Sequence, residues 1–268
     1  MKHIQRFLAL LCSLMLLSTA AFASSYSSVI DSIFESYQSN DNNADNVYHQ
    51  MVNGFYRSFE FGYVIANQLN TTGRYTTTIS NILSSFESGN NSATTVYQQM
   101  ANGTYRTTEI LYVIANEVDT NGRYSSMISN IMDTYERVDN SCETVYQQIA
   151  NGTYRSFELA YVIACCLDTR GAYSKQIESV YDDFVSGNDA AETVYQQIAI
   201  GTYRTTEMFY IISLILDTNG QYTSYLEGVW DRYADVDNRA ETVYPQIANG
   251  AYRTTELLYF IATYYSRK

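Results

Sequence analysis

Tyrosine, arginine and glutamate recur in one fixed pattern along this sequence and could together recognise a ligand. In the second of five repeats they stand at Tyr105, Arg106, Glu109 and Tyr112, and the pattern returns every 49 residues. A tyrosine ring offers an apolar plate with a polar tip. Such a strip could bind a glycan or an extended peptide. The candidate ladder consists of Tyr56, Glu60, Tyr63, Tyr105, Arg106, Glu109, Tyr112, Tyr154, Arg155, Glu158, Tyr161, Tyr203, Arg204, Glu207, Tyr210, Tyr252, Arg253, Glu256 and Tyr259.

The same columns also suit packing between repeats. A helix inside a repeat array touches its own unit and both neighbours, so stacked tyrosines could be buried there. Arg106 and Glu109 are three residues apart, a spacing that allows an ion pair on a helix. The two interpretations differ in one prediction: a binding site leaves the tyrosines accessible, whereas packing buries them.

The sequence offers little for catalysis. Beyond residue 23 the single histidine is His49, which stands where other repeats have a glutamine such as Gln98. A nucleophile would therefore have one possible histidine base, and a histidine-based metal cluster is excluded. Paired carboxylates such as Asp182 and Asp183 could serve catalysis, but these two occupy the outer side of a short helix, where a solvated face explains them more simply. We expect a non-enzymatic protein with no catalytic residue, cofactor or metal.

Three cysteines belong to the third repeat. If Cys142 and Cys165 lie on one straight helix, they are about 35 Å apart, which is beyond the reach of a disulfide. If the chain instead doubles back at residues 151–152, the two cysteines could meet. Cys165 and Cys166 are adjacent in the sequence and show no metal-binding spacing.

A period of 49 residues predicts a tandem repeat array rather than one globular core. The dipeptide Val-Tyr marks it, because it recurs at the same position in every repeat. The units are residues 26–74, 75–123, 124–172, 173–221 and 222–268, within a repeat domain of residues 24–268.

Each unit is predicted to hold a short and a long amphipathic helix. In unit two, Tyr75, Ile79, Ile82 and Phe86 follow helical spacing, and a longer helix spans about residues 92–118. The polar stretch 87–91 is expected to end the first helix. Glycines suited to a left-handed cap follow the long helices at Gly73, Gly122, Gly171 and Gly220. Capping boxes are predicted for the pairs Asn140 and Glu143, Asp189 and Glu192, and Asn238 and Glu241.

The dipeptide Asn-Gly inside the long helix leaves two alternatives open. At residues 102–103 it could form a hairpin turn, but unit four has Ile200 before Gly201, and a β-branched residue resists positive φ. Gly103 also falls on the apolar seam. We favour a helix that continues through the glycine or kinks there, with a kink suggested at Pro245. The fold class is therefore all-α, a tandem, α-solenoid-like helical-repeat array.

Residues 1–23 are typical of a signal peptide, with a basic start, an apolar run and a small-residue cleavage pattern. The apolar run is shorter than the roughly 20 residues that span a bilayer, so we expect no stable membrane span after cleavage. Beyond it lie 14 of the 16 Lys and Arg and all 28 Asp and Glu, a net charge of −14. This charge argues against nucleic acid as a partner. The expected location is secreted, periplasmic or cell-surface.

The two ends of the array suggest how the protein works. Unit five closes with the apolar run 257–261, and an exposed apolar end marks a contact surface. The ends either meet head-to-tail between molecules or fold back and cover themselves. We expect an exported structural or interaction protein that self-associates or presents a repeated tyrosine-rich surface. Its partner would be itself, another extracytoplasmic protein or a glycan. The alternative is an extracytoplasmic binding module that holds a glycan or an extended peptide on the ladder.

Overall fold

Each unit folds into an outer helix and a longer inner helix. The computed structural model describes residues 22–268, so the predicted signal peptide lies almost wholly outside the described part. Residues 22–268 contain no strand, and the expected all-α repeat array is confirmed. The outer helices are α2 (Phe22–Asn42), α4 (Thr76–Ser92), α6 (Ser125–Asp139), α8 (Ser174–Ala190) and α10 (Thr223–Arg239), and the inner helices are α3 (Val47–Leu69), α5 (Val96–Val118), α7 (Val145–Leu167), α9 (Val194–Leu216) and α11 (Val243–Ser266).

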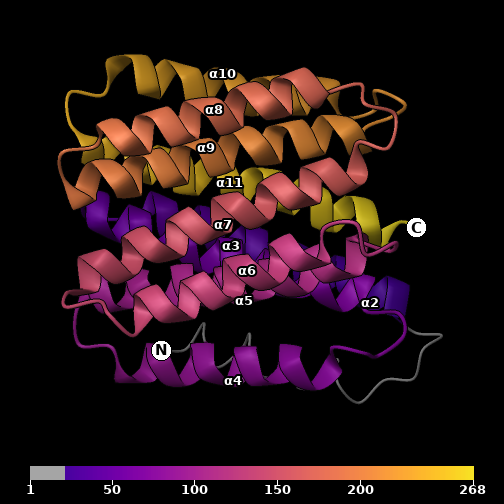
Figure 1. The fold of residues 1–268 in the computed structure, drawn as a ribbon, viewed down its shortest axis with the longest axis horizontal. Coiled ribbons are helices and arrows are strands. Elements are labelled where there is room, and N and C mark those ends of the chain that lie inside the picture. The colour runs from indigo at the N-terminus through magenta and orange to yellow at the C-terminus, as the bar shows by residue number, and fades with distance from the viewer. Residues whose placement is uncertain (1–21) are drawn as a thin grey trace.

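The five inner helices form a closed ring. Each inner helix packs on the next one along the chain, and the last, α11, packs on the first, α3, as extensively as the others do. The outer helices follow the same pattern, because α2 contacts both α3 and α11. Figure 1 shows the helices running lengthwise, with their connections gathered at the two ends. Since an outer helix returns the chain between successive inner helices, all five inner helices run in the same direction.

The seam between the last and first units has the same register as the junctions inside the chain. Oγ1 of Thr108 donates to the carbonyl oxygen of Gly152, 44 residues further on, at 2.9 Å. At the seam, Oγ1 of Thr255 donates to the carbonyl oxygen of Gly54, 201 residues back, also at 2.9 Å. The two separations, 44 and 201, together make 245 residues, which is five units of 49. The ring therefore closes in register, a feature that the repeat pattern did not specify.

Glycine lets neighbouring inner helices approach closely. A Cβ atom added at Gly152 would lie 2.9 Å from Oγ1 and 3.0 Å from Cβ of Thr104 on α5. At the seam, a Cβ atom added at Gly54 would lie 2.7 Å from Cβ of Ala251 on α11. Both distances are too short for a real side chain. The glycine of the Asn-Gly dipeptide is thus required by helix packing and not by a turn.

The asparagine of the same dipeptide joins the inner helix to its outer helix. Nδ2 of Asn102 donates to the carbonyl oxygen of Phe86 at 2.8 Å. Three other units repeat this bond, and in unit four Ile200 packs over Gly187 instead. The inner helices continue through the dipeptide. Pro245 lies in the first turn of α11, where the backbone N–H has no helical partner, so the proline gives no reason for a kink.

The predicted capping boxes are wrong. Asn140 with Glu143 and Asp189 with Glu192 lie four residues before the boxes of α7 and α9, and in place of Asn238 with Glu241 the N-cap of α11 is Thr242, whose side chain makes no cap hydrogen bond. The boxes observed are Thr95 with Gln98, Thr144 with Gln147, and Thr193 with Gln196. Glutamine accepts from the N-cap N–H as glutamate would. The outer helices also run further than expected, because the polar stretch 87–91 remains inside α4.

The turn after each inner helix agrees with the sequence. Gly122 has φ 69°, in the left-handed region, and Gly73, Gly171 and Gly220 have φ between 67° and 74°. The carboxylate of Asp119 then accepts from the backbone N–H of Tyr124 at 3.0 Å. This aspartate holds the start of the next outer helix.

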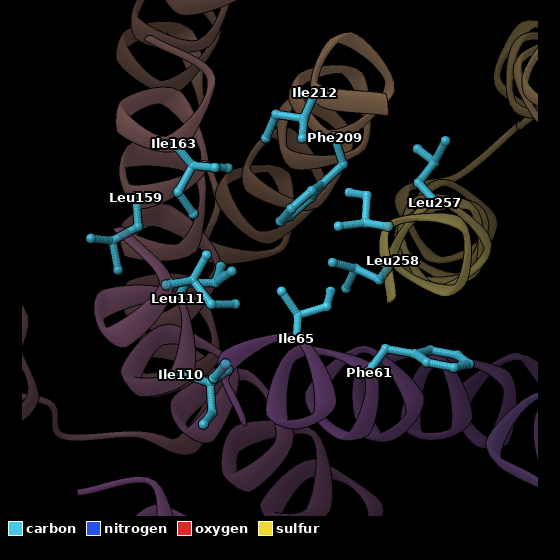
Figure 2. Packing of buried hydrophobic residues seen from close by; sticks show 14 of the residues in the cluster. Phe61, Ile65, Ile110, Leu111, Leu159, Ile163, Phe209, Ile212, Leu257 and Leu258 are labelled. Carbon is cyan, nitrogen blue, oxygen red and sulfur yellow. The ribbon is translucent and has the colours of Figure 1, made fainter. Parts of the chain in front are cut away.

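The inward sides of the long helices form the axial core. Figure 2 shows Ile65, Leu111, Ile163, Phe209 and Leu258, one from each inner helix, directed toward the middle of the ring. Each of these side chains is at most 4% exposed. No unit could bury this stripe alone, so the units stabilise one another.

The apolar end of the last unit is covered within the molecule. Leu257, Phe260 and Ile261 are at most 4% exposed, because α11 packs on α3 and α2. Tyr259 stacks on Phe34 of α2, with ring centroids 4.2 Å apart. Of the two arrangements left open for the chain ends, the terminal units cover each other. Contact between molecules through these chain ends has no exposed apolar run to drive it.

Candidate interaction surfaces

The ladder lies on the outward side of each inner helix, beneath the outer helix of the next unit. Tyr105 of α5 contacts Tyr135 of α6, with ring centroids 5.1 Å apart, and Tyr252 of α11 contacts Tyr37 of α2 across the seam at 5.3 Å. Tyr105 keeps 9% of its surface exposed and Tyr252 keeps 5%. The ladder tyrosines therefore serve packing between units. The others in contact with an outer helix are Tyr56, Tyr154, Tyr161, Tyr203, Tyr210 and Tyr259, while Tyr63 is buried and Tyr112 is half-buried against the core.

Each ladder arginine pairs with the glutamate three positions later. Nη1 of Arg106 lies 2.6 Å from Oε2 of Glu109. Burial raises the pKa of Glu109, although the neighbouring arginine opposes the shift. These pairs are part-buried structural groups rather than free charges. The other pairs are Arg57 with Glu60, Arg155 with Glu158, Arg204 with Glu207, and Arg253 with Glu256.

Clefts open beside the ladder between neighbouring outer helices. One, of about 290 Å³, lies between α4 and α6 and is lined by polar side chains that include Arg106, Asp139 and Gln148. The buried hydroxyl of Tyr105, at the same cleft, has no hydrogen-bond partner. A second cleft, of about 400 Å³, lies at the seam and includes Arg253. Planar polar groups of this kind can bind hydroxyl groups of a ligand.

A second tyrosine cluster, which the ladder does not include, closes one end of the ring. Its members contact one another in a circle, with ring centroids 4.9 to 5.7 Å apart and the seam pair at 5.5 Å. Each is half-buried and is the second residue of an inner helix. We call this end of the ring the tyrosine end. The cluster consists of Tyr48, Tyr97, Tyr146, Tyr195 and Tyr244.

The hydroxyl groups at the tyrosine end bind one another. Burial, together with hydrogen bonds to Tyr146 and Tyr48, raises the pKa of Tyr97 to about 12. A hydrogen bond with Tyr195 raises the pKa of Tyr146. The tyrosine end therefore presents neutral hydroxyls and aromatic edges at physiological pH.

Below the tyrosines the ring axis is filled. Oγ1 of Thr104 donates to the carbonyl oxygen of Met100 at 3.1 Å, and Oγ1 of Thr107 donates to that of Gly103 at 2.8 Å. These hydroxyls are satisfied by their own helix. The cavity they line is only about 30 Å³, space for about one water molecule. The axis is thus no ligand site.

Exposed carboxylates surround the tyrosine end. Four of the five inner helices have an acidic residue immediately before the N-cap residue, and each of these side chains is exposed. Basic residues nearby are fewer, and Arg239 is already paired with Asp235. The four carboxylates are those of Asp45, Glu143, Glu192 and Glu241.

The opposite end, which we call the basic end, carries exposed arginine and lysine side chains. The aspartates of its connections, Asp119, Asp168 and Asp217, keep their negative charge but are buried or half-buried, where they accept from the backbone of the following outer helix. Arg123 lies over the ring of Tyr124, 5.2 Å from its centroid. The exposed basic residues are Arg74, Arg123, Arg170, Lys175, Arg267 and Lys268.

The remaining reactive groups form no site among residues 22–268. Cys142, Cys165 and Cys166 are free thiols, and α7 is one continuous helix between the first and the others. Burial raises the pKa of Cys166 to about 12, so this thiol stays protonated. The described residues contain no cluster of three metal-binding side chains. None of their helices is long and apolar enough to cross a membrane.

No family model, curated protein or solved structure matches this chain. The function must therefore be argued from the ring itself, its clefts and its two ends.

Proposed function

We propose that this protein is an exported, non-enzymatic interaction protein whose closed ring presents the tyrosine end to a partner outside the cytoplasm. The observation that carries the proposal is the circle of five half-buried tyrosines, one from each unit. Tyrosine is enriched at protein interfaces, because its ring supplies apolar contact and its hydroxyl stays hydrogen-bonded.

Closure of the ring holds the side chains of the tyrosine end in an ordered arrangement that favours binding. Neighbouring rings hold each tyrosine in place, and Met100 and Ile149 lie in the cluster directly beneath them. Side chains that are already ordered lose little entropy when a partner binds. A rigid contact surface is therefore available without rearrangement of the ring.

The residues at this end support binding rather than catalysis. His49 is exposed, and its Nδ1 lies 3.9 Å from Oδ2 of Asp45. Gln98 and Pro245 occupy the same position in other units, so the five units do not share a base. The signal-peptide pattern of residues 1–23 supports export.

Photo-crosslinking in cells that express the protein tests this proposal. A benzophenone amino acid is placed at Thr94, an exposed position at the tyrosine end, or at Asp133, an exposed position on the outer side of α6. We expect crosslinked adducts from position 94 and few from position 133. Equal labelling at both positions, or none at position 94, contradicts the proposal.

A second candidate function is glycan binding in the clefts between outer helices. It is favoured by the polar lining of the cleft over α5 and by the unpaired hydroxyl of Tyr105. A glycan array compares the wild-type protein with the Asp139→Asn and Gln148→Ala variants. Binding that both substitutions weaken supports this function, and binding that neither changes argues against it.

A further inference from the structure

We infer that the tyrosine end of one ring docks on the basic end of a second copy of this chain, so that rings stack along a common axis. The inference rests on the proposed function, because it names the partner of the tyrosine end. It is carried by two features of the ring ends: their opposite charges, and the apolar layer at the centre of each.

The charges of the two ends are complementary. Glu143 and Glu192 are exposed at the tyrosine end, next to the circle of tyrosines. Arg170 and Lys175 are exposed at the basic end, in the connection between α7 and α8 and in the first turn of α8. Opposite charges attract when these two ends face each other, whereas two tyrosine ends repel. Charge therefore favours one relative direction of the rings.

Each end also has an apolar or aromatic centre. At the tyrosine end it is the circle of five tyrosine rings. At the basic end, the apolar side chains that face the ring axis end four residues after Ile65 in α3 and four residues after the corresponding residue in each of the other inner helices. These last residues include half-buried side chains packed against the core. They are Leu69, Val118, Leu167, Leu216 and Tyr265. An apolar centre with a charged rim is the usual anatomy of a protein interface.

The direction of stacking makes the assembly open-ended. The two surfaces in contact are different, so the interface is heterologous. Every docked ring leaves one free tyrosine end and one free basic end, and neither is covered by the contact already made. Stacks can therefore grow by addition of further rings, while the terminal helices α2 and α11 stay packed on each other inside each ring.

Sedimentation velocity of the purified exported protein tests the stacking directly. The Debye length is about 30 Å at 0.01 M salt and about 3 Å at 1 M. We expect the weight-average mass to rise with protein concentration at low salt, above the mass of one chain. We expect this rise to be lost at high salt. A mass that stays at one chain at low salt and high concentration overturns the inference.

A charge exchange distinguishes this contact from others. The Glu143→Lys, Glu192→Lys variant replaces two of the four carboxylates at the tyrosine end by positive charges, and the Arg170→Glu, Lys175→Glu variant replaces two of the six positive charges at the basic end by carboxylates. All four side chains are exposed, so we expect both variants to fold, which circular dichroism checks. Each variant alone should associate at least about tenfold more weakly than the wild type. An equimolar mixture should recover association, because the altered ends complement each other.

The outcomes separate this inference from the proposed function. Crosslinked dimers of the chain from position 94, together with recovery in the mixture, support both. Adducts with other proteins and a monomeric wild type overturn the stacking and leave the proposed function standing. A mixture that fails to associate, although the wild type does, shows that the two ends are not the contact and overturns the inference.

Discussion

At Gly152 an added Cβ would lie 2.9 Å from Oγ1 and 3.0 Å from Cβ of Thr104, so one methyl group is enough to disturb the contact between α7 and α5. We expect Gly152→Ala to lower the free energy of unfolding by about 1–3 kcal/mol. The matched control is Gly228→Ala in α10, where the nearest atom to the new Cβ is Nη1 of Arg232 at 3.6 Å. That change should stabilise the protein by roughly 0.5–1 kcal/mol, because alanine restricts the unfolded chain.

Urea unfolding of both alanine variants measures this difference. The two changes should shift the midpoint in opposite directions, since the added group is the same and only the surrounding space differs. Equal shifts would show that the glycine found at this position in every unit reflects helix propensity rather than close packing.

The buried glutamate of unit one predicts a dependence of stability on pH. Burial raises the pKa of Glu60, although Arg57 opposes the shift. Burial also raises the pKa values of Glu109 and Glu158. The folded protein then binds these protons more tightly than the unfolded chain does. The free energy of unfolding therefore falls as pH rises through the raised pKa values.

We expect the melting temperature to rise when the pH is lowered from neutral toward these pKa values. The Glu60→Gln variant should reduce the slope of melting temperature against pH, because one of the raised pKa values is removed. A melting temperature that falls on mild acidification of the wild type would contradict the assignment.

Between helices, one pair of side chains joins each inner helix to the outer helix of the next unit, and the two members of the pair change together from junction to junction. Phe157 of α7 stacks on Phe184 of α8 with ring centroids 3.9 Å apart, and Phe59 stacks on Phe86 at 4.0 Å. Where the inner position is a threonine, as at Thr108, the next outer helix has a tyrosine. The same pairing of threonine with tyrosine holds across the seam, where α11 carries Thr255 and α2 carries Tyr37.

This matching predicts coupled effects of mutation. Phe157→Thr should cost about 3 kcal/mol of stability, because it leaves a void beside Phe184. Adding Phe184→Tyr should recover roughly 0.5–2 kcal/mol by recreating the pair found in other units. The control combines Phe157→Thr with Phe86→Tyr, which belongs to a different junction. In this control the two changes in the free energy of unfolding should be additive. Denaturant unfolding of the single and double variants gives the coupling energy, and an equal coupling in both double variants would refute the matching rule.

The sequence predicted the helices better than their contacts. The period of 49 residues and the apolar spacing identified the helix pairs, and Gly122 and its equivalents marked the turns. The capping boxes were misplaced, because Asn140 with Glu143 stands next to the true pair, Thr144 with Gln147. Tyr97 was recognised as an invariant column, but its ring contacts with other units depend on how the helices are arranged around the axis.

Closure of the ring is a property of the whole molecule that no single unit encodes. It depends on the angle between neighbouring units and on how many units there are. An open repeat stack stays folded when a unit is removed, because its stability is close to a sum of unit and neighbour terms. A ring of five units held by contacts in one register cannot lose a unit without changing the angle at every junction.

We therefore expect opposite results from rearranging the ring and from shortening it. A circular permutant that begins at Thr76 and joins residue 268 to residue 24 should fold to a monomer of similar stability, because α11 and α2 already contact each other. Deletion of residues 124–172 should abolish cooperative unfolding or cause aggregation, because the remaining units cannot meet at the seam. Size-exclusion chromatography and thermal unfolding by circular dichroism compare the two. A four-unit chain that is monomeric and melts as cooperatively as the intact protein would show that contact between α11 and α3 is dispensable for the fold.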